Sequence, residues 1–168
     1  MRLSKAPRPV RLGIKGTASL AVLIGWPILV GNIAYTAYDV VTLDGCAKGW
    51  LQIQDDYKIA AEHTPPSADP MVVAGYLAEN EHSLESRAQA LICPHAVQDE
   101  QADFLAANRV YSSMLDVVSH SGFPADEANQ QLLFFQLHQS GQAAGDAQDD
   151  FTRSLTAEYA AQHPEAAR

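Results

Sequence analysis

The sequence predicts an all-α fold, in which a single N-terminal transmembrane helix continues into an antiparallel, up-and-down bundle of about four helices. Three observations lead to this fold class. A stretch of 22 residues near the N-terminus contains no charged side chain. Beyond that stretch, apolar residues recur every three or four positions, which is the period of an amphipathic helix. No run of any length alternates apolar and polar residues, so no β-strand is predicted.

The uncharged stretch, residues 17–38, is the predicted transmembrane anchor. At 1.5 Å per residue it extends about 33 Å, which is enough to cross a hydrocarbon core of about 30 Å. The preceding tail, residues 1–16, carries five Lys or Arg residues and no acid. By the positive-inside rule, this basic tail lies in the cytoplasm. We therefore expect a single-pass protein of the inner (cytoplasmic) membrane with a periplasmic or otherwise extracytoplasmic C-terminal domain.

Two alternatives to an uncleaved anchor stay open. A secretory signal also combines a basic start with an apolar core, but its cleavage site needs small residues in an Ala-x-Ala-like pattern. Tyr35 is a bulky residue where the pattern ending at Ala37 requires a small one. The second alternative is a lipoprotein site at Cys46, although the acidic residues Asp39 and Asp44 separate this cysteine from the apolar core.

The charge of the chain is distributed unevenly. Its formal net charge is -9, yet all 20 acidic residues lie from Asp39 onward, together with only 6 of the 11 Lys and Arg residues. The part of the chain beyond the anchor therefore has a net charge of -14. Such a domain repels phosphate groups, which excludes nucleic acid as a partner.

The part beyond the anchor is predicted to form one extracytoplasmic helical bundle over residues 39–161, followed by a disordered tail over 162–168. Proline and glycine divide this domain into helices, because proline cannot continue a helix and glycine often ends one. The expected helices span residues 39–62, 70–92, 98–120 and 124–161.

The boundaries of these helices depend on a few local signals. Asp69 followed by Pro70 is an N-cap with proline at the first helical position, which starts the second helix. Pro94 ends that helix. Gly122 can take the left-handed conformation that ends the third helix, and Pro124 is expected to open the fourth.

The sequence indicates which residues of two of the helices face the core. The last helix contains a stretch of small residues, 141–147, which either lets a neighbouring helix approach closely or leaves the middle of this helix loosely packed. Its remaining stripe is apolar. The buried stripe of the second helix is predicted to consist of Val73, Leu77, Leu84, Ala88 and Leu91 or Ile92.

Four motifs follow the anchor in order: Tyr38-Asp39 with Trp50-Leu-Gln-Ile53, Val73-Ala-Gly-Tyr76 with Ser83-Leu84-Glu85, Phe123-Pro124 with Ala128-Asn129, and the Leu/Phe-rich stretch from Leu132 to Leu137. In this order and spacing they resemble the LemA family, whose members combine an N-terminal anchor with an antiparallel helical bundle. The chain resembles a divergent member, since Glu79-Asn80 stands where the family has His-Glu. The resemblance implies a membrane protein whose molecular activity is not settled across the family. Some relatives are associated with envelope or organelle-membrane biogenesis.

Cys46 and Cys93 are the only cysteines in the chain. In an oxidising compartment they would form a disulfide that closes a loop of 48 residues, worth about 3 to 4 kcal/mol in the chain-entropy model. The predicted helices, however, place Cys93 about 9 Å along the bundle axis from the level of Cys46. A bridge then requires a shifted hairpin or a bent helix end. A disulfide and two buried thiols are both left open.

No residue pattern in the chain predicts catalysis, a cofactor or a metal ion. Glu79 and His82 have the i, i+3 spacing of di-iron bundles, but those bundles use the motif twice and no second copy occurs. The six histidines are dispersed without zinc-like spacing, and no glycine-rich phosphate loop is present. The expectation is therefore a protein that is not an enzyme.

The expected function is that of a non-enzymatic scaffold or interaction protein of the cell envelope or of membrane biogenesis. Its expected partners are the lipid bilayer, through the N-terminal helix, and unidentified envelope proteins, with a homo-oligomer left open. Two other functions stay open: a ligand-responsive envelope regulator or sensor, and a phage or plasmid envelope protein of similar architecture.

Overall fold

The computed structural model describes residues 42–67 and 69–164. The predicted anchor over residues 17–38 and the basic tail before it lie outside the described residues. Within the described part of the chain, no helix is both long enough and apolar enough to cross a membrane.

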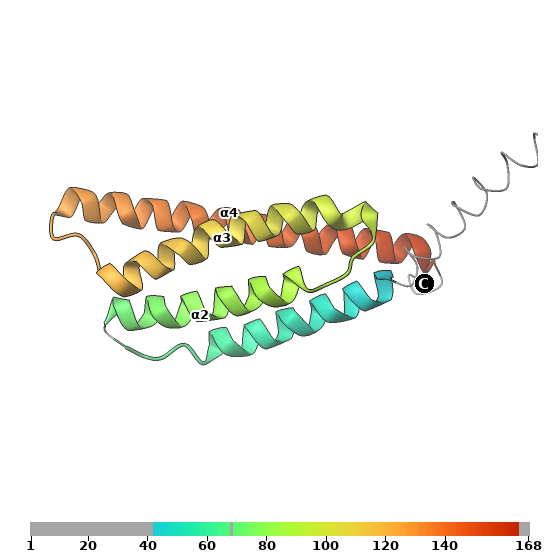
Figure 1. Cartoon of the computed structure of the whole chain (residues 1–168), viewed down its shortest axis with the longest axis horizontal. Coiled ribbons are helices and arrows are strands. Elements are labelled where there is room, and N and C mark those ends of the chain that lie inside the picture. Colours follow the sequence, from blue (N-terminus) through green and yellow to red (C-terminus); the bar gives the residue numbers. More distant parts are fainter. Residues whose placement is uncertain (1–41, 68, 165–168) are drawn as a thin grey trace, which may run out of the picture. The chain divides into compact units, whose positions relative to one another are not determined.

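The described residues form four long helices packed as an antiparallel bundle, as the sequence predicted (Figure 1). Each long helix runs opposite to the one before it, and a short 3-10 helix lies between the second and the third. The elements are the first helix over residues 42–62, α2 (Pro70–Gln89), η1 (His95–Val97), α3 (Gln98–Ser121) and α4 (Glu127–Gln162).

Side-chain caps fix the starts of α2 and α4. The Asp69 carboxylate accepts a hydrogen bond from the backbone N–H of Met71 at 2.9 Å, so α2 begins at Pro70 as predicted. The prediction that α4 opens at Pro124 was wrong. The Asp126 side chain accepts from the backbone N–H of Asn129 at 2.9 Å, which makes Asp126 the N-cap of α4.

The ends of α2 and α3 have different causes. Gly122 has a φ of 68°, the left-handed conformation expected of it, and this ends α3. The prediction that α2 runs to residue 92 was wrong, because α2 ends at Gln89 and the chain from residue 91 to 94 is not helical. The side-chain amide of Gln101 donates hydrogen bonds to the backbone carbonyls of Ala88 and Leu91, at 2.8 and 3.2 Å. These two carbonyls, at the end of the helix, thereby gain a partner.

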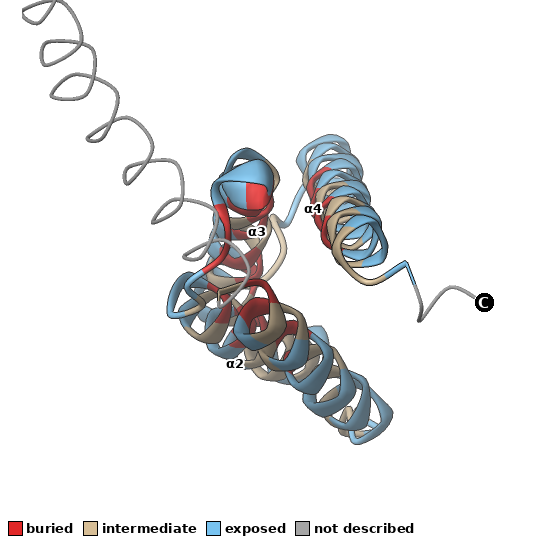
Figure 2. Ribbon diagram, turned by 90° about the vertical axis from the view of Figure 1, so that its right-hand side faces the viewer, coloured by how far each residue is buried: buried red, intermediate tan, exposed pale blue. Residues whose placement is uncertain are grey.

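The buried residues lie on the sides of the helices that face one another (Figure 2). Their side chains form two clusters. The larger cluster is built around Trp50, Phe104 and Phe151, whose rings pack edge-on or stacked with centroids 4.8 to 6.4 Å apart. The smaller cluster lies toward the turn between α3 and α4. Its buried members are Ala74, Ala78, Leu115 and Val118.

The beginning of the first helix and the end of α4 lie at the same end of the bundle. His163 and Asp44 approach to 3.5 Å there. The turn between α3 and α4 lies at the opposite end (Figure 1). The bundle therefore has one end close to residue 42 and another end about 54 Å away along the 36 residues of α4.

Candidate functional site

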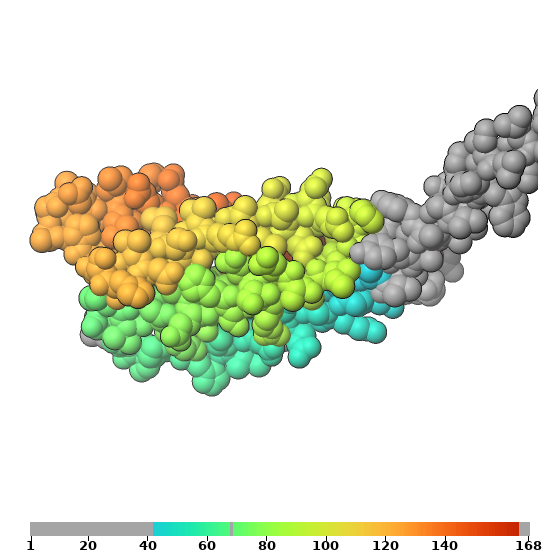
Figure 3. Space-filling view, viewed as in Figure 1, coloured from blue at the N-terminus to red at the C-terminus, as the bar shows by residue number. Residues whose placement is uncertain are grey.

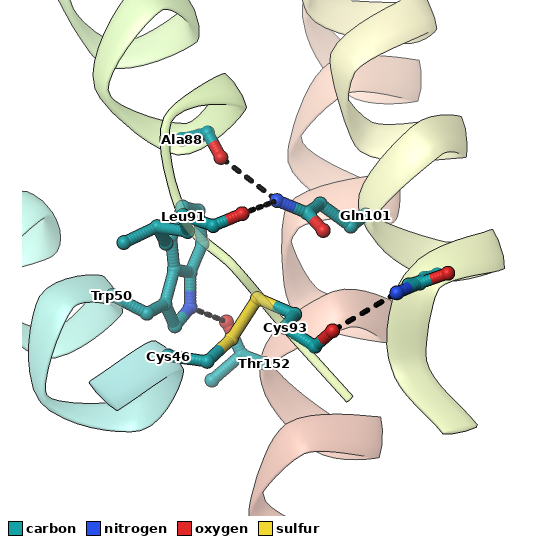
Figure 4. The surroundings of a disulfide bond; sticks show 8 residues. Cys46, Trp50, Ala88, Leu91, Cys93, Gln101 and Thr152 are labelled. Carbon is teal, nitrogen blue, oxygen red and sulfur yellow. Dashed lines mark hydrogen bonds between the residues drawn. A yellow bond between two sulfur atoms is a disulfide. The ribbon is translucent and has the colours of Figure 1, made fainter. Parts of the chain in front are cut away.

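Cys46 and Cys93 are joined by a disulfide, with their Cα atoms 5.0 Å apart (Figure 4). Both residues are buried next to Trp50 in the larger core cluster. The early end of α2 removes the axial offset that the sequence predicted, because residues 91–94 leave the helix and lead Cys93 back to the first helix. The side-chain amide of Gln98 donates to the Cys93 carbonyl at 3.0 Å, which holds this segment in place.

A cavity of about 550 Å³ lies in the bundle between the two clusters, and all four long helices contribute to its wall. The first helix supplies Tyr57, α2 supplies Glu81, and α3 supplies Asn108 and Tyr111. The remaining wall is α4 over residues 134–148. Since this volume is within the usual range for small-molecule sites, the cavity is the candidate functional site.

Glu81 is the buried acid of this cavity, with only 3% of its surface exposed. The hydroxyl of Tyr57 donates a short hydrogen bond to the Glu81 carboxylate oxygen Oε1. The side-chain amide of Asn108 donates to the backbone carbonyl of Glu81 at 3.1 Å. Among the described residues, none donates a hydrogen bond to the second carboxylate oxygen, Oε2. A buried carboxylate can accept several hydrogen bonds, so the capacity of Glu81 is only partly used.

The cavity exists because the middle of α4 carries small residues. Ala144 is buried, and Gly141 and Gly145 line the cavity. A Cβ atom added to Gly141 would lie 3.2 Å from the Tyr111 ring, whereas one added to Gly145 would meet nothing within 4 Å. The structure shows both alternatives in this stretch: Gly141 lies close against the Tyr111 ring, whereas the position of Gly145 is open.

Burial is the largest cause of the pKa shifts in the cavity. It raises the pKa of the Glu81 carboxyl, while the Tyr57 hydrogen bond and nearby His82 act in the opposite direction. Burial and then the interaction with Glu81 also raise the pKa of Tyr57 and that of Tyr111. Among the residues that the structure describes, no lysine or arginine lines the cavity. Glu81 is therefore an acid without a permanent positive charge beside it in the cavity wall.

The sequence predictions missed Glu81 and pointed to its neighbours. Glu79 is exposed, and His82 pairs with Asp116 on the surface at 2.8 Å. The prediction for the buried stripe of α2 was wrong in part: Val73 and Leu77 are only half-buried. The fully buried positions are Ala74, Ala78, Glu81, Leu84 and Ala88.

A spacing signal could have identified Glu81. Its position follows Ala78 by three residues and precedes Leu84 by three, so it lies on the same helix face. The stripe was assigned by apolar character alone, and that criterion passes over an acid. An acid in phase with an apolar stripe is the pattern that indicates a buried carboxyl group.

Replacing Glu81 by glutamine should change how stability depends on pH. The folded-state pKa of Glu81 lies above its ordinary value of 4.5, so the folded chain binds the proton more tightly than the unfolded chain. The contribution of Glu81 to stability is thus fully present below pH 4.5 and is lost as pH rises through the folded-state pKa. We expect Glu81→Gln to stabilise the protein increasingly, relative to the parent, as pH rises from 4 to 8. Thermal unfolding over this range checks it, and a pH-independent difference in Tm would contradict it.

A second feature lies next to the cavity, at the end of the bundle formed by the end of α3 and the start of α4 (Figure 3). Phe134 lines the cavity and also stacks on Phe123, with ring centroids 4.5 Å apart. A surface hollow of about 390 Å³ runs beside this pair. We call these side chains the apolar end; its members are Val117, Phe123, Leu132, Phe134 and Phe135.

No protein-family model matches the chain, and no curated protein or solved structure is significantly similar to it. The resemblance to the LemA family therefore stays a prediction from the motifs. Within residues 42–67 and 69–164, no group of three or more His, Cys, Asp or Glu residues is placed to hold a metal ion. The cavity and the apolar end are the features on which the proposals below rest.

Proposed function

We propose that this chain is a membrane-anchored, LemA-like protein of the cell envelope that acts without catalysis, as a scaffold. In this proposal the basic tail is cytoplasmic, residues 17–38 cross the inner membrane, and the helical bundle is extracytoplasmic. The bundle binds a partner protein through its apolar end. The exposure of the aromatic side chains at that end is the observation that carries the proposal.

Four of the five members of the apolar end leave much of their surface in water. Phe134 and Phe135 are 52% and 56% exposed, and Val117 and Leu132 are exposed to a similar degree. A cluster of exposed large apolar side chains on a small domain is typical of a protein-interaction surface. Aromatic residues are also the usual anchors at the centre of an interface, because they bury much area with little loss of side-chain freedom.

The charge of the bundle favours a different protein over a second copy. Two domains with a net charge of -14 repel each other. A partner with an apolar contact surface and basic residues around it would be attracted instead. We therefore propose such an envelope protein as the partner, and self-association is an outcome that the test below would reveal.

The disulfide and the position of the apolar end support the proposed topology. Disulfides form and persist in oxidising compartments, and the periplasm is one of them. The apolar end lies away from residue 42, which is where the anchor would enter the bundle. An interface at that end would lie at the opposite end of the bundle from residue 42.

Site-specific photocrosslinking in cells of the source organism tests this interface. A photoreactive amino acid in place of Phe135 should give a discrete adduct larger than the chain. The same amino acid in place of Ile59, which is equally exposed on the first helix, serves as the matched control and should give none. Absence of an adduct at position 135, equal adducts at both positions, or only a dimer of this chain would contradict the proposal.

The cavity around Glu81 favours a second candidate, a ligand-responsive envelope regulator. Phe134 contributes to both the cavity wall and the apolar end. A ligand that moved this side chain would change the interface beside it. This candidate requires that the cavity bind a small molecule.

A further inference from the structure

The Glu81 cavity has a chemical character that a scaffold would not need. Among residues 42–67 and 69–164, Glu81 is the one acid in its wall and is buried, and no lysine or arginine lines it. The hydrogen-bonding capacity of the Glu81 carboxylate is only partly used. Two arginines of α2 and α3 are engaged in other ion pairs: Arg87 pairs with Asp56 at 2.7 Å, and Arg109 pairs with Glu85 at 2.6 Å. We propose that this cavity is a binding site for a small organic cation that carries an ammonium group, which contacts Glu81.

The carboxylate of Glu81 supplies the main contact. A charge buried in a protein is costly unless an opposite charge and hydrogen bonds accompany it. Tyr57 gives Oε1 one hydrogen bond and no charge. An alkylammonium group has one positive charge and three N–H donors. It would thus supply both the counter-charge and a donor to Oε2.

The rest of the wall suits the hydrocarbon part of such a ligand. The rings of Tyr57, Tyr111 and Phe134 line the cavity. Aromatic faces attract cations electrostatically and also cover apolar groups. The side chains of Asn108 and Gln148 add amide oxygens that can accept from an ammonium group. Carboxylate, amides and aromatic rings together favour an organic cation over a neutral molecule.

Other ligand classes fit the cavity less well. A phosphate or carboxylate ligand would need basic side chains, which the wall lacks. A divalent metal ion would need several ligating groups, and Glu81 is the only carboxylate that the described part of the chain places in the wall. The overall negative charge of the bundle raises the local concentration of cations. The charge of the bundle therefore favours cations over anions before a ligand reaches the cavity.

The exposed side of the cavity gives a path to solvent. His138, Gln142 and Gly145 line the cavity and are exposed on α4. No atom lies within 4 Å of a Cβ added to Gly145, so this position is open. A small ligand can therefore enter beside α4 without separation of the helices.

Thermal unfolding of the full-length protein in an uncharged detergent tests the proposal with n-butylammonium chloride as the probe. At ten times its Kd the probe should raise Tm by about 3 to 6 °C, and the rise should saturate. The neutral analogue 1-butanol and an equal concentration of potassium chloride should not give this saturable rise. The scaffold proposal is not needed for this result, since the probe acts on the cavity alone.

Three variants locate the effect in the cavity. Glu81→Gln keeps an oxygen that can accept from Tyr57 but removes the charge, and it should weaken butylammonium binding at least tenfold. Glu79→Gln makes the same change of charge on the exposed face of α2 and should bind as the parent does. Gly145→Leu fills the entrance from an open helical position, so it tests the site without altering Glu81, and it should also abolish the rise.

Several results would overturn the proposal. These are no saturable rise in the parent protein, an equal rise with 1-butanol or potassium chloride, or unchanged binding in Glu81→Gln. If Glu81→Gln fails to fold, unchanged binding in Gly145→Leu would overturn it. A loss of binding in both cavity variants with full binding in Glu79→Gln would support it.

Discussion

Replacing Cys46 and Cys93 together with alanine is expected to lower the free energy of unfolding by about 4 kcal/mol. The bridge joins residues separated by 47 positions, and the chain-entropy model assigns about 4 kcal/mol to a loop of this length. The effect arises mainly in the unfolded state, which gains conformational freedom when the loop is opened. The alanines also remove two buried sulfur atoms from the larger core cluster, which acts in the same direction.

Urea unfolding of the full-length protein in detergent, followed by circular dichroism, measures this loss. Complete reduction of the parent protein, checked by thiol labelling, is the control, because it opens the loop without changing the sequence. The reduced parent and the alanine variant should lose stability to a similar degree. A reduced parent as stable as the oxidised protein would contradict the proposed contribution of the disulfide.

Trp50→Ala is expected to destabilise the protein by about 3 to 5 kcal/mol, the usual cost of truncating a large buried aromatic side chain. Its indole ring packs edge-on against Phe104 and Phe151, with centroids 5.2 and 4.8 Å away. Its N–H donates to the Thr152 hydroxyl at 2.9 Å, which ties the first helix to α4. Alanine would leave a cavity between three helices and would remove that hydrogen bond.

The adjacent residue provides a matched control for this substitution. Leu51 is 60% exposed on the same helix, and Leu51→Ala should cost less than about 1 kcal/mol. Trp50→Phe keeps an aromatic ring but removes the N–H donor and part of the ring volume, so its cost should lie between zero and that of Trp50→Ala. Equal effects of the Trp50 and Leu51 truncations would show that the ring cluster does not dominate the core.

Local signals in the sequence were sufficient for the antiparallel helical bundle and for several boundaries. Asp69 with Pro70 predicted the start of α2, and Gly122 predicted the end of α3, because caps and left-handed glycines depend on a few neighbouring residues. The apolar spacing predicted four antiparallel helices. Pro124 gave a wrong start for α4, because Asp126, two residues later, has the side chain that caps the helix.

The features that the sequence did not predict depend on tertiary contacts. The end of α2 is set by Gln101, thirteen residues beyond Ala88, whose carbonyl it binds. Glu81 was overlooked because the stripe was assigned by apolar character alone, and the partner that accompanies this acid in the interior, Tyr57, comes from another helix. The stretch around Gly141 and Gly145 was recognised, but only the packed bundle shows that it leaves a cavity beside an acid.

The central claim is that the bundle lies outside the cytoplasm with its disulfide formed. A reporter enzyme that is active only outside the cytoplasm, fused after Arg168 and expressed in a diderm bacterium, tests this claim directly. The same cells are lysed with a thiol-blocking reagent, and the gel mobility of the chain is compared with and without reductant. The account predicts an active reporter and a reduction-sensitive shift in mobility that the Cys46→Ala/Cys93→Ala variant lacks. An inactive reporter together with two labelled free thiols would contradict it.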